Sequence, residues 1–459
     1  MKSRRTLPSS FRDPSGFLFA EDGRLFRQVN HVYKDNYDLL LGSGLYHDLV
    51  DAGLLIPHEE TDLAEVDGAY KVLRPEVLPF VSYPYEWSFS QLKDAALTTL
   101  RIQKRALDFG MSLKDASVYN VQFRGGKPLL IDTLSFEQYR EGEPWVAYRQ
   151  FCQHFLAPLA LMSRKDIRLN QLLRVYIDGV PLGLASRLLP LTTRASFSLL
   201  AHIHLHAGAE RRFTSKPAIA TNRKMDRRSF LALIDNLESA VRGLKWQPKG
   251  TQWADYYAST NYTEEATLHK RQLVAEFLDR LTPAPRSAWD LGANTGLFSR
   301  VAAEKGIFTV SLDVDPACVE RNYLDCKKRA ETHILPLLID LTNPSSSLGW
   351  ASRERMSLVE RGPADVALAL ALVHHLAIAN NLPFAMIADF FASVCRFLII
   401  EFVPKEDSQV QRLLSTREDI FPQYTQAHFE LEFGRRFRLL TAARVNQSAR
   451  VLYLMERQD

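Results

Sequence analysis

The stretch of residues 288–298, AWDLGANTGLF, constrains the fold of this chain more than any other segment. An apolar strand that ends near Asp290 is followed at once by a turn of small residues, and an apolar helix begins directly after the turn. Gly292 and Gly296 allow a tight turn and a close approach of the backbone to a ligand, and Asn294 tolerates a left-handed backbone. This succession predicts a site for a nucleotide-like ligand at the turn.

The segment around this turn alternates between helices and strands. From about residue 264 a helix leads to a strand, a glycine-containing loop, a helix and a further strand, an order typical of a parallel sheet with helices on its faces. We therefore expect an α/β fold with a Rossmann-like, doubly wound sheet. The second strand, residues 308–312, ends at Asp313, which follows Gly296 at close to the spacing of about 20 residues at which a strand-end acid bonds ribose hydroxyls.

These residues resemble the first motif of the class I S-adenosylmethionine-dependent methyltransferases, which has the form acidic-x-Gly-x-Gly-x-Gly. Residues 290–296, DLGANTG, match it except that Asn294 stands at the middle glycine. The resemblance implies that Asp290 and the backbone of the glycine turn approach the methionine portion of S-adenosylmethionine, and that Asp313 binds its ribose.

The resemblance continues along the chain. Residues 338–341, LIDL, place Asp340 where the family has the acid that usually meets the adenine amine, and residues 364–376, ADVALALALVHHL, resemble the family's fourth strand and the following loop. An ordinary strand-to-helix turn is the alternative for the glycine turn alone. An NAD-type site is a nearer alternative, but it expects the spacing GxGxxG, whereas the two glycines here are four residues apart.

Two polar residues after later strands are candidates for the chemistry. Methyl transfer from a sulfonium requires in-line placement of a nucleophile and exclusion of water, with a base where the nucleophile carries a proton, and it requires no metal. His375 follows the fourth strand and Glu401 follows the apolar run 397–400, so both fall at strand ends, where open α/β sheets bind their ligands. Each is a candidate base or substrate contact, and packing under the cofactor is the alternative for His375. Four aromatic residues that precede the first helix of this region are candidates for a lid over the cofactor or for core packing: Trp253, Tyr256, Tyr257 and Tyr262.

A second pattern lies in residues 111–136, MSLKDASVYNVQFRGGKPLLIDTLSF. It resembles the catalytic segment of protein kinases and aminoglycoside phosphotransferases, in which a loop Asp accepts the substrate proton and a later Asn and Asp hold Mg²⁺. The resemblance implies an α+β kinase-like domain that binds ATP and Mg²⁺. In that domain Asp115 would be the base, and Asn120 and Asp132 would be the metal ligands.

Departures from the family pattern predict that this kinase-like domain is degenerate. Lys114 and the residue before it replace the usual His-Arg or His-Gly ahead of the loop Asp, and no Phe-Gly follows Asp132. Residues 16–29 contain no glycine-rich phosphate loop, and Arg27 stands where the strand should offer a lysine. A plain hairpin, with Asn and Asp in turn roles, is the alternative.

The length of 459 residues suggests two or three domains at roughly 150 residues each. We expect a kinase-like domain over residues 1–210, a basic helical connector over 211–250 and a class I methyltransferase domain over 251–459. The charge of 57 basic against 53 acidic residues is too balanced to indicate nucleic acid or a membrane as partner. Basic residues gather in 211–228. Because few aromatic residues are interleaved with them, we interpret this segment as a solvated connector, and a nucleic-acid-binding patch is the alternative.

The remaining features indicate a cytoplasmic protein. The chain has four cysteines, Cys152, Cys318, Cys326 and Cys395. Their positions show no paired spacing, as expected for reduced thiols. The N-terminus lacks the apolar run of a signal peptide, and the longest apolar run, residues 364–379, is interrupted by two histidines and too short to span a bilayer. His202 and His206 share a helical face without a third ligand nearby in sequence, so we expect no metal site.

The sequence thus predicts transfer of a methyl group from S-adenosylmethionine to an unidentified acceptor, with the N-terminal domain as a substrate-binding or regulatory module. Two alternatives stay open. One is an ATP- and Mg²⁺-dependent small-molecule phosphotransferase with a cofactor-sensing C-terminal domain. The other is a non-enzymatic scaffold that only holds the cofactor.

Overall fold

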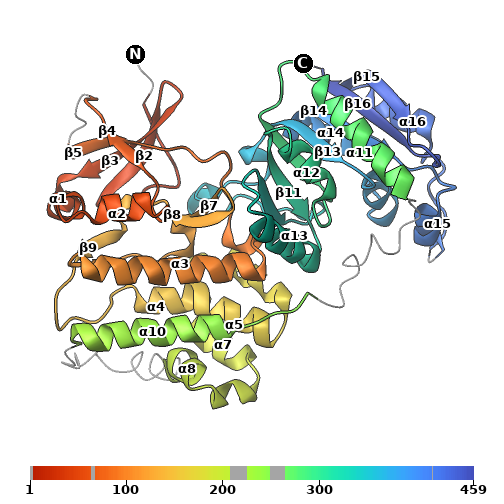
Figure 1. Cartoon of the computed structure of the whole chain (residues 1–459). Helices are drawn as coiled ribbons and strands as arrows, with labels where there is room; N and C mark the ends of the chain where they lie inside the picture. Colours follow the sequence, from red (N-terminus) through yellow and green to blue (C-terminus); the bar gives the residue numbers. More distant parts are fainter. Residues whose placement is uncertain (1–3, 64–67, 207–224, 249–263, 416, 459) are drawn as a thin grey trace. The chain divides into compact units, whose positions relative to one another are not determined.

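A computed structural model of the chain describes residues 4–63, 68–206, 225–248, 264–415 and 417–458 (Figure 1). The chain forms two compact units. Unit 1 comprises Met1–Gln247 and Ser347–Arg355, and unit 2 comprises Pro248–Ser346 and Met356–Asp459. The aromatic residues proposed for a lid, at positions 253–262, and residues 211–224 of the basic segment lie outside the described residues.

Unit 1 begins with an antiparallel sheet whose strand order is β1-β2-β3-β5-β4. Its strands are β1 (Arg5–Thr6), β2 (Gly16–Glu21), β3 (Arg24–Asn30), β4 (His58–Glu60) and β5 (Ala69–Pro75). The helices α1 (Lys34–Gly42) and α2 (Leu45–Asp51) lie between β3 and β4 in the chain. The strands β2 and β3 form a hairpin because Asp22 and Gly23, at φ 51° and 73°, supply the left-handed backbone that its tight turn needs.

The second part of unit 1 is built around the long helix α3 (Phe89–Asp108). Ser88 and Gln91 form a capping box at its start, with the Ser88 hydroxyl accepting from the Gln91 amide and the Gln91 side chain accepting from the Ser88 amide. Two small antiparallel sheets follow: β6 (Met111–Leu113) pairs with β9 (Phe136–Gln138), and between them in the chain β7 (Val121–Arg124) and β8 (Lys127–Leu130) form a hairpin. Short helices complete this part: 3₁₀ helices Pro84–Glu86, Val118–Asn120, Thr133–Ser135, Ile167–Gln171 and Leu191–Ala195, π helices Cys152–Leu156 and Leu200–Leu205, and α4 (Tyr148–Phe151), α5 (Ala157–Arg164), α6 (Leu172–Val175), α7 (Leu182–Leu188) and α8 (Phe197–Leu199).

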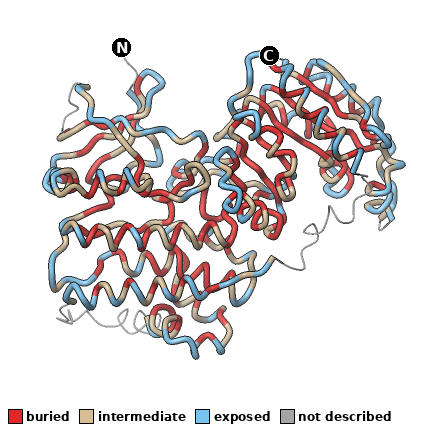
Figure 2. Tube along the Cα trace, viewed as in Figure 1, coloured by how far each residue is buried: buried red, intermediate tan, exposed pale blue. Residues whose placement is uncertain are grey.

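Helix α10 (Arg227–Gly243) falls in the range expected as a connector and packs against α3 as part of unit 1. Its buried residues recur at helical spacing and are Phe230, Ile234, Leu237 and Val241. Lys104 of α3 lies 2.6 Å from the Asp235 carboxylate and 2.5 Å from that of Glu238. Figure 2 shows the inward sides of these helices as buried and their outward sides as exposed.

The segment Ser347–Arg355 belongs to unit 1 by its contacts, although in the chain it lies between two strands of unit 2. The Glu354 carboxylate accepts hydrogen bonds from Arg12, at 2.9 Å from Nη2 and 3.1 Å from Nε. The Arg355 guanidinium lies 4.2 Å from the centre of the Tyr119 ring, a cation–π contact. The chain therefore leaves unit 2 and returns to it within a few residues.

Unit 2 is a mixed α/β unit with a seven-stranded sheet in the order β12-β11-β10-β13-β14-β16-β15. The parallel strands are β10 (Ser287–Leu291), β11 (Phe308–Asp313), β12 (Ile334–Leu338), β13 (Ala364–Ala369) and β14 (Cys395–Phe402). The strands β15 (Phe437–Arg444) and β16 (Val451–Arg457) pair antiparallel at one edge, an addition that the alternation in the sequence did not indicate. The helices are α11 (Glu264–Asp279), α12 (Leu297–Ala303), α13 (Pro316–Arg329), α14 (Phe384–Val394), α15 (Ser408–Leu414) and α16 (Gln426–Phe433), with a 3₁₀ helix Val359–Arg361 and a π helix His375–Ala379 in the loops. The 3₁₀ helix Trp350–Ser352 belongs to the segment that packs in unit 1. The strand and helix expected on either side of the glycine turn are confirmed as β10 and α12.

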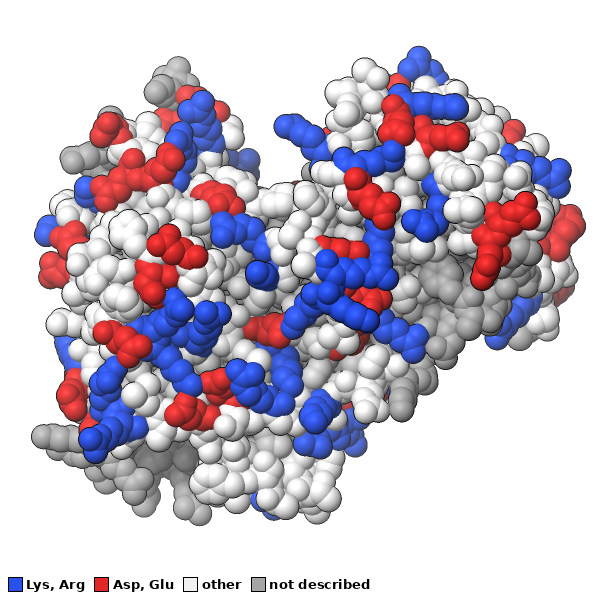
Figure 3. All heavy atoms as spheres, viewed as in Figure 1, with Lys and Arg blue, Asp and Glu red and all other residues white. Residues whose placement is uncertain are grey.

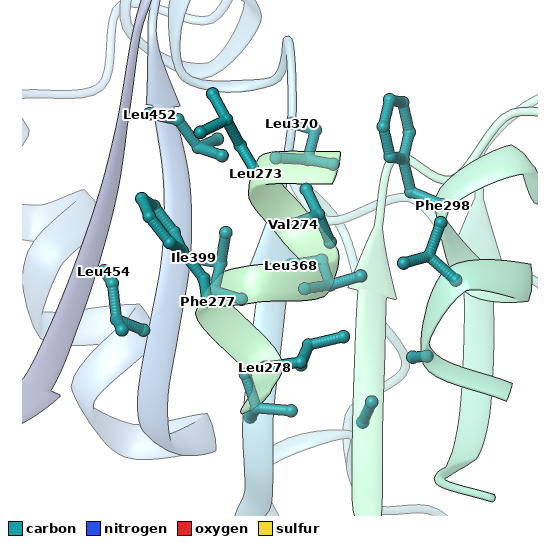
Figure 4. Packing of buried hydrophobic residues seen from close by; sticks show 14 of the residues in the cluster. Leu273, Val274, Phe277, Leu278, Phe298, Leu368, Leu370, Ile399, Leu452 and Leu454 are labelled. Atoms are coloured by element: carbon teal, nitrogen blue, oxygen red, sulfur yellow. The ribbon is translucent and has the colours of Figure 1, made fainter. Parts of the chain in front are cut away.

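Helices cover both faces of this sheet. On one face, α11 and α12 bury apolar side chains against β13, β14 and β16; Figure 4 shows Val274 and Phe277 of α11 next to Leu368 and Ile399. Alternate residues of β14 and β16 point to the other face, where Tyr453 meets Phe429 of α16 at a ring distance of 5.3 Å. Both faces of the central strands are therefore buried.

The surface of each unit carries both signs of charge. Figure 3 shows Lys and Arg next to Asp and Glu over the face that it draws. At the β15–β16 edge, for example, the Glu456 carboxylate lies within ion-pair distance of Arg396 and Arg438. Among the described residues no helix combines the length and the apolar character that a membrane span requires.

Candidate functional site

The glycine turn lies where β10 ends, at the point in the sheet where the strand order changes direction. From β10 the parallel strands run to β11 and β12 on one side and to β13 and β14 on the other, and open α/β sheets bind their ligands outside such a switch point. Gly292, Asn294 and Gly296 all have positive φ, at 78°, 51° and 80°. The amide of Gly292 donates to the Leu312 carbonyl at 2.9 Å, which ties the turn to the end of β11. Backbone conformation therefore explains the residue choice at all three positions.

Asp313, at the end of β11, contacts this turn directly. One of its carboxylate oxygens accepts from the Asn294 amide at 2.7 Å and the other from the Asp315 amide at 2.8 Å. Burial raises the pKa of the Asp313 carboxyl to about 6. The structure thus brings together the expected ribose acid and the expected cofactor turn.

Asp290, inside β10, is also buried, and burial raises its pKa to about 6. Its carboxylate accepts from the Ser299 hydroxyl at 2.6 Å. Ser299 also bonds the Ser311 hydroxyl, which in turn accepts from the Asn322 side chain at 2.8 Å. A polar network therefore runs beneath the turn, from β10 through α12 and β11 to α13.

The two glycines of the turn face different neighbours. A side chain at Gly292 would bring its Cβ to 3.3 Å from Leu372, which lies in the loop after β13. A Cβ at Gly296 would lie 2.5 Å from the Asn322 side chain and 2.8 Å from that of Arg300. Gly296 is thus required by packing as well as by its backbone, and the loop after β13 borders the turn at Gly292.

Asp340 lies just after β12, exposed, where its carboxylate accepts from the amide and hydroxyl of Thr342 at 2.9 and 2.6 Å. The neighbouring Ile339 amide donates to the Asp313 carbonyl at 2.8 Å. The three expected cofactor acids, Asp290, Asp313 and Asp340, therefore belong to adjacent strands, at or beside their carboxyl ends.

Glu401, near the end of β14, is fully buried in a group of charged residues. Its Oε2 lies 2.6 Å from the Lys270 ammonium and accepts from the Ala371 amide at 2.6 Å. Its Oε1 lies 3.9 Å from Arg450, which also binds Asp407 at 2.8 Å. These contacts give Glu401 a positioning role toward the loop after β13, and its expected role as base or substrate contact stays a prediction.

The two histidines of that loop have different surroundings. His375 is half-buried, and burial lowers the pKa of its imidazole to about 4. His374 is fully buried, with its ring centre 4.1 Å from that of His375. A catalytic role for His375 stays a prediction.

The kinase-like pattern in unit 1 also forms one cluster. The Asp115 carboxylate accepts from the Ser117 amide at 2.8 Å and from the Gln150 side chain at 2.7 Å, and the Asn120 side chain also bonds it. Asn120 in turn donates to the Ser135 hydroxyl at 3.3 Å. Burial and then the nearby Asp132 carboxylate raise the pKa of Asp115.

Asp132 completes this cluster but is already engaged. Ser135 donates to one of its oxygens at 2.6 Å, and the guanidinium of Arg27, on β3, forms an ion pair with the other. Lys114, the other unusual residue of the segment, bonds the Ser15 hydroxyl at 2.6 Å. The three residues of the pattern lie together, but their arrangement does not fit a Mg²⁺ ion, because Arg27 supplies the positive charge at Asp132.

Comparison with known proteins places the whole chain in a family. No family model matches it. Nodulation protein NoeA of Rhizobium meliloti (strain 1021) is 38% identical to it over 460 residues, an alignment that covers 98% of this chain and 96% of that protein. The chain belongs to the NoeA family.

Solved structures resemble the NoeA-family chain over less than half its length. WbdD has a TM-score of 0.31 and 16% identity over 46% of this chain and 43% of its own. The magnesium protoporphyrin IX methyltransferase ChlM of Synechocystis PCC 6803 has a TM-score of 0.33 and 17% identity over 45% of this chain and 92% of its own. The N-methyltransferase NodS of Bradyrhizobium japonicum WM9 has a TM-score of 0.31 and 12% identity over 43% of this chain and 98% of its own.

The residues of this NoeA-family protein fit S-adenosylmethionine at the β10–β12 edge. Asp313 offers carboxylate oxygens that suit ribose hydroxyls, and Asp290 places a second buried acid beneath the turn. Gly292 carries no side chain, so its backbone permits close approach in the narrow space that Leu372 borders. No group of three or more His, Cys, Asp or Glu residues that suits a metal ion occurs in the described part of the chain.

Several residues of the site carry no motif that reveals them. Lys270 reaches Glu401 across 131 positions of sequence, and Ser311 and Asn322 read as ordinary residues of a strand and a helix. A charged residue among the apolar positions of α11 was the one available signal, since Lys270 lies on the face that contains Val274 and Phe277.

Proposed function

We propose that unit 2 has a Rossmann-like class I methyltransferase fold and transfers a methyl group from S-adenosylmethionine to an acceptor. The observation that carries this proposal is the contact of Asp313 with the Asn294 amide, which joins the glycine turn after β10 to the acid after β11. Both lie at the switch point, where a nucleoside-containing ligand binds in sheets of this kind. The cofactor supplies an activated methyl group on a positively charged sulfur.

The chain's own residues would hold the cofactor by three kinds of contact. Asp313 and the exposed Asp340 offer carboxylate oxygens to the ribose and the adenine amine, respectively. The turn from Gly292 to Gly296 offers backbone to the methionine portion. Asp290 adds negative charge below the turn, which favours a cationic ligand there.

The remaining task of the protein is to orient the acceptor and to exclude water. The loop after β13 is suited to this because it borders Gly292 through Leu372 and is fixed by the Glu401–Ala371 hydrogen bond. His375 and Glu401 remain our candidates for the base or for substrate contact. The acceptor is unidentified.

For unit 1 we propose a degenerate kinase-like domain that binds the substrate or regulates unit 2. The clustering of Asp115, Asn120 and Asp132 supports the kinase-like fold, and the Arg27–Asp132 ion pair supports degeneracy. We further propose that the protein is cytoplasmic and has no membrane partner; nucleic acid is disfavoured as a partner, and the basic segment 211–228 leaves it open. The four cysteines, which are buried and form no disulfide, support a reducing compartment.

Calorimetry with S-adenosylhomocysteine on the full chain tests the proposal. We expect one site per chain, together with transfer of label from methyl-labelled S-adenosylmethionine to a component of a cell extract. Binding without any transfer would favour a scaffold. Absence of binding, together with tight binding of Mg²⁺-ATP that Asp132→Ala abolishes, would favour the phosphotransferase.

A further inference from the structure

His374 is a buried polar residue that the proposed function does not yet use. Its side chain is fully buried, and neither ring nitrogen has a hydrogen-bond partner among the described residues. Buried polar groups are nearly always paired, and an unpaired one costs stability. Leaving two nitrogens of one ring unpaired therefore indicates that a partner is supplied from elsewhere.

The position of His374 relates it to the methyl-transfer site. It belongs to the loop after β13, at the carboxyl edge of the sheet, two residues after Leu372, which borders Gly292. Ala371, in the same loop, has a left-handed backbone with φ 50° and donates its amide to Glu401. Because Lys270 holds Glu401 at 2.6 Å, a buried ion pair fixes the stretch of chain that presents His374.

The surroundings keep the His374 ring neutral. Burial first, and then electrostatic repulsion from His375, Arg450 and Lys270, lower the pKa of His374 well below its ordinary value. A neutral imidazole has one nitrogen that donates and one that accepts. Because Glu401 and Asp407 pair with Lys270 and Arg450, these four residues present no net charge that would select an ionic ligand group. A neutral hydroxyl can either donate to or accept from the ring.

We propose that His374 is the hydrogen-bonding partner of the methyl acceptor, and that the acceptor presents a neutral hydroxyl group to it. The methyl group moves from the sulfonium sulfur to the hydroxyl oxygen, S-adenosylhomocysteine leaves, and the hydroxyl proton passes to the accepting nitrogen of His374 and from there to water. This inference rests on the proposed methyl transfer and adds the class of substrate. Glu401 and Lys270 act as positioning residues that fix the loop, and they need not touch the substrate.

The stability of His374→Leu tests the premise without any acceptor. Leucine has a similar volume and no polar atom, so the melting temperature should stay the same or rise. His154 is the matched control, because it is a buried histidine whose Nδ1 accepts from the Val118 amide at 3.2 Å. His154→Leu should lower the melting temperature by a few degrees. An equal fall in His374→Leu would show that its ring is already paired, and would overturn the proposal.

Transfer of labelled methyl to the acceptor in a cell extract tests the role itself. His374→Leu should lower product formation about 100-fold, as loss of a proton-handling group does, with affinity for S-adenosylhomocysteine within twofold of wild type. His374→Gln, which restores a donor and an acceptor, should recover part of the activity. Product formation within threefold of wild type in His374→Leu would overturn the assignment, while failure of the wild type to bind S-adenosylhomocysteine would instead overturn the proposed function.

The labelled product tests the acceptor class. A methyl ether formed on a hydroxyl withstands mild base and releases methyl iodide in hydriodic acid. Release of the label as methanol in mild base would indicate a methyl ester, and therefore an acidic acceptor, which would contradict the proposed hydroxyl.

Discussion

Arg27 of β3 forms an ion pair with Asp132, one of the two residues that the kinase resemblance assigns to the metal. The pair joins the N-terminal sheet of unit 1 to the loop that follows β8. Both side chains are about nine-tenths buried, with 12% of each exposed. The Arg27 guanidinium thus neutralises the Asp132 carboxylate without a metal ion.

Removing one partner of this pair should be costly. Arg27→Met leaves the Asp132 carboxylate without its cation, and we expect a loss of about 2–4 kcal/mol in the free energy of unfolding, measured by urea denaturation. Arg74→Met, which breaks the exposed pair with Glu59 on neighbouring strands, should cost less than about 1 kcal/mol. Equal losses in the two variants would show that burial does not make the Arg27–Asp132 pair more important for stability than an exposed pair.

Gly292→Ala should weaken the binding of S-adenosylhomocysteine at least tenfold in calorimetry, because a methyl group there narrows the space beside Leu372 and strains a residue at φ 78°. Gly306→Ala is the control, since Gly306 has nearly the same φ, 77°, with no atom within 4 Å of its added Cβ. Both variants carry the left-handed strain of roughly 1–2 kcal/mol, but only the first alters the turn. Unchanged affinity in folded Gly292→Ala would argue against the assigned site.

The stability of the ligand-free protein should depend on pH through Asp290 and Asp313. Their folded pKa values, about 6, lie above the ordinary value of 3.8, so between about pH 4 and 6 the folded state keeps protons that the unfolded state has released. The contribution of these two carboxyls therefore falls as the pH rises through that window, by roughly 2–3 kcal/mol for each carboxyl.

Comparison of wild type with Asp290→Asn/Asp313→Asn by denaturation at pH 4.5 and 7 isolates this contribution. The double variant should gain stability relative to wild type at pH 7 and less so at pH 4.5. A difference between the two proteins that does not change with pH would contradict the expectation.

Lys270→Met should destabilise unit 2 by about 3–5 kcal/mol, because it leaves the buried Glu401 without its nearest cation. Lys305→Met, which breaks a pair with the exposed Asp279, should cost under about 1 kcal/mol. Adding Glu401→Leu to Lys270→Met should recover much of the loss, since neither charge of the Lys270–Glu401 pair then remains and Arg450 keeps Asp407 as its partner. Failure to recover would point to a role of Glu401 beyond neutralising Lys270.

The sequence predicted best where local pattern and chemistry coincide. The strand, glycine turn and helix at 288–298 could be predicted because small residues with left-handed backbones mark the turn. The antiparallel strands β15 and β16 could not, since pairing at a sheet edge depends on contacts between distant segments. The sequence predicted a helical connector over 211–250. It did not indicate that the helix there, α10, packs against α3, although Phe230, Ile234, Leu237 and Val241 carry the spacing of a buried helix face.

The buried charges were harder to foresee. Lys270 and Arg450 lie at opposite ends of unit 2 in the sequence, and their roles become visible only when the sheet brings both beside Glu401. A sequence pattern assigns charge to the surface by default, because burying it is costly without a partner. Here the folded sheet brings the partner of each buried charge next to it, and the sequence alone does not show that contact.

The packing of Ser347–Arg355 in unit 1 determines how the protein can be divided. A cut near residue 247 would give an N-terminal fragment without Glu354 and Arg355, which leaves Arg12 without its carboxylate and Tyr119 without its guanidinium. The complementary fragment would carry those nine residues as a loose insertion between β12 and β13. Separate production of the two units therefore calls for grafting the 347–355 peptide onto the first and closing the gap in the second with a short linker.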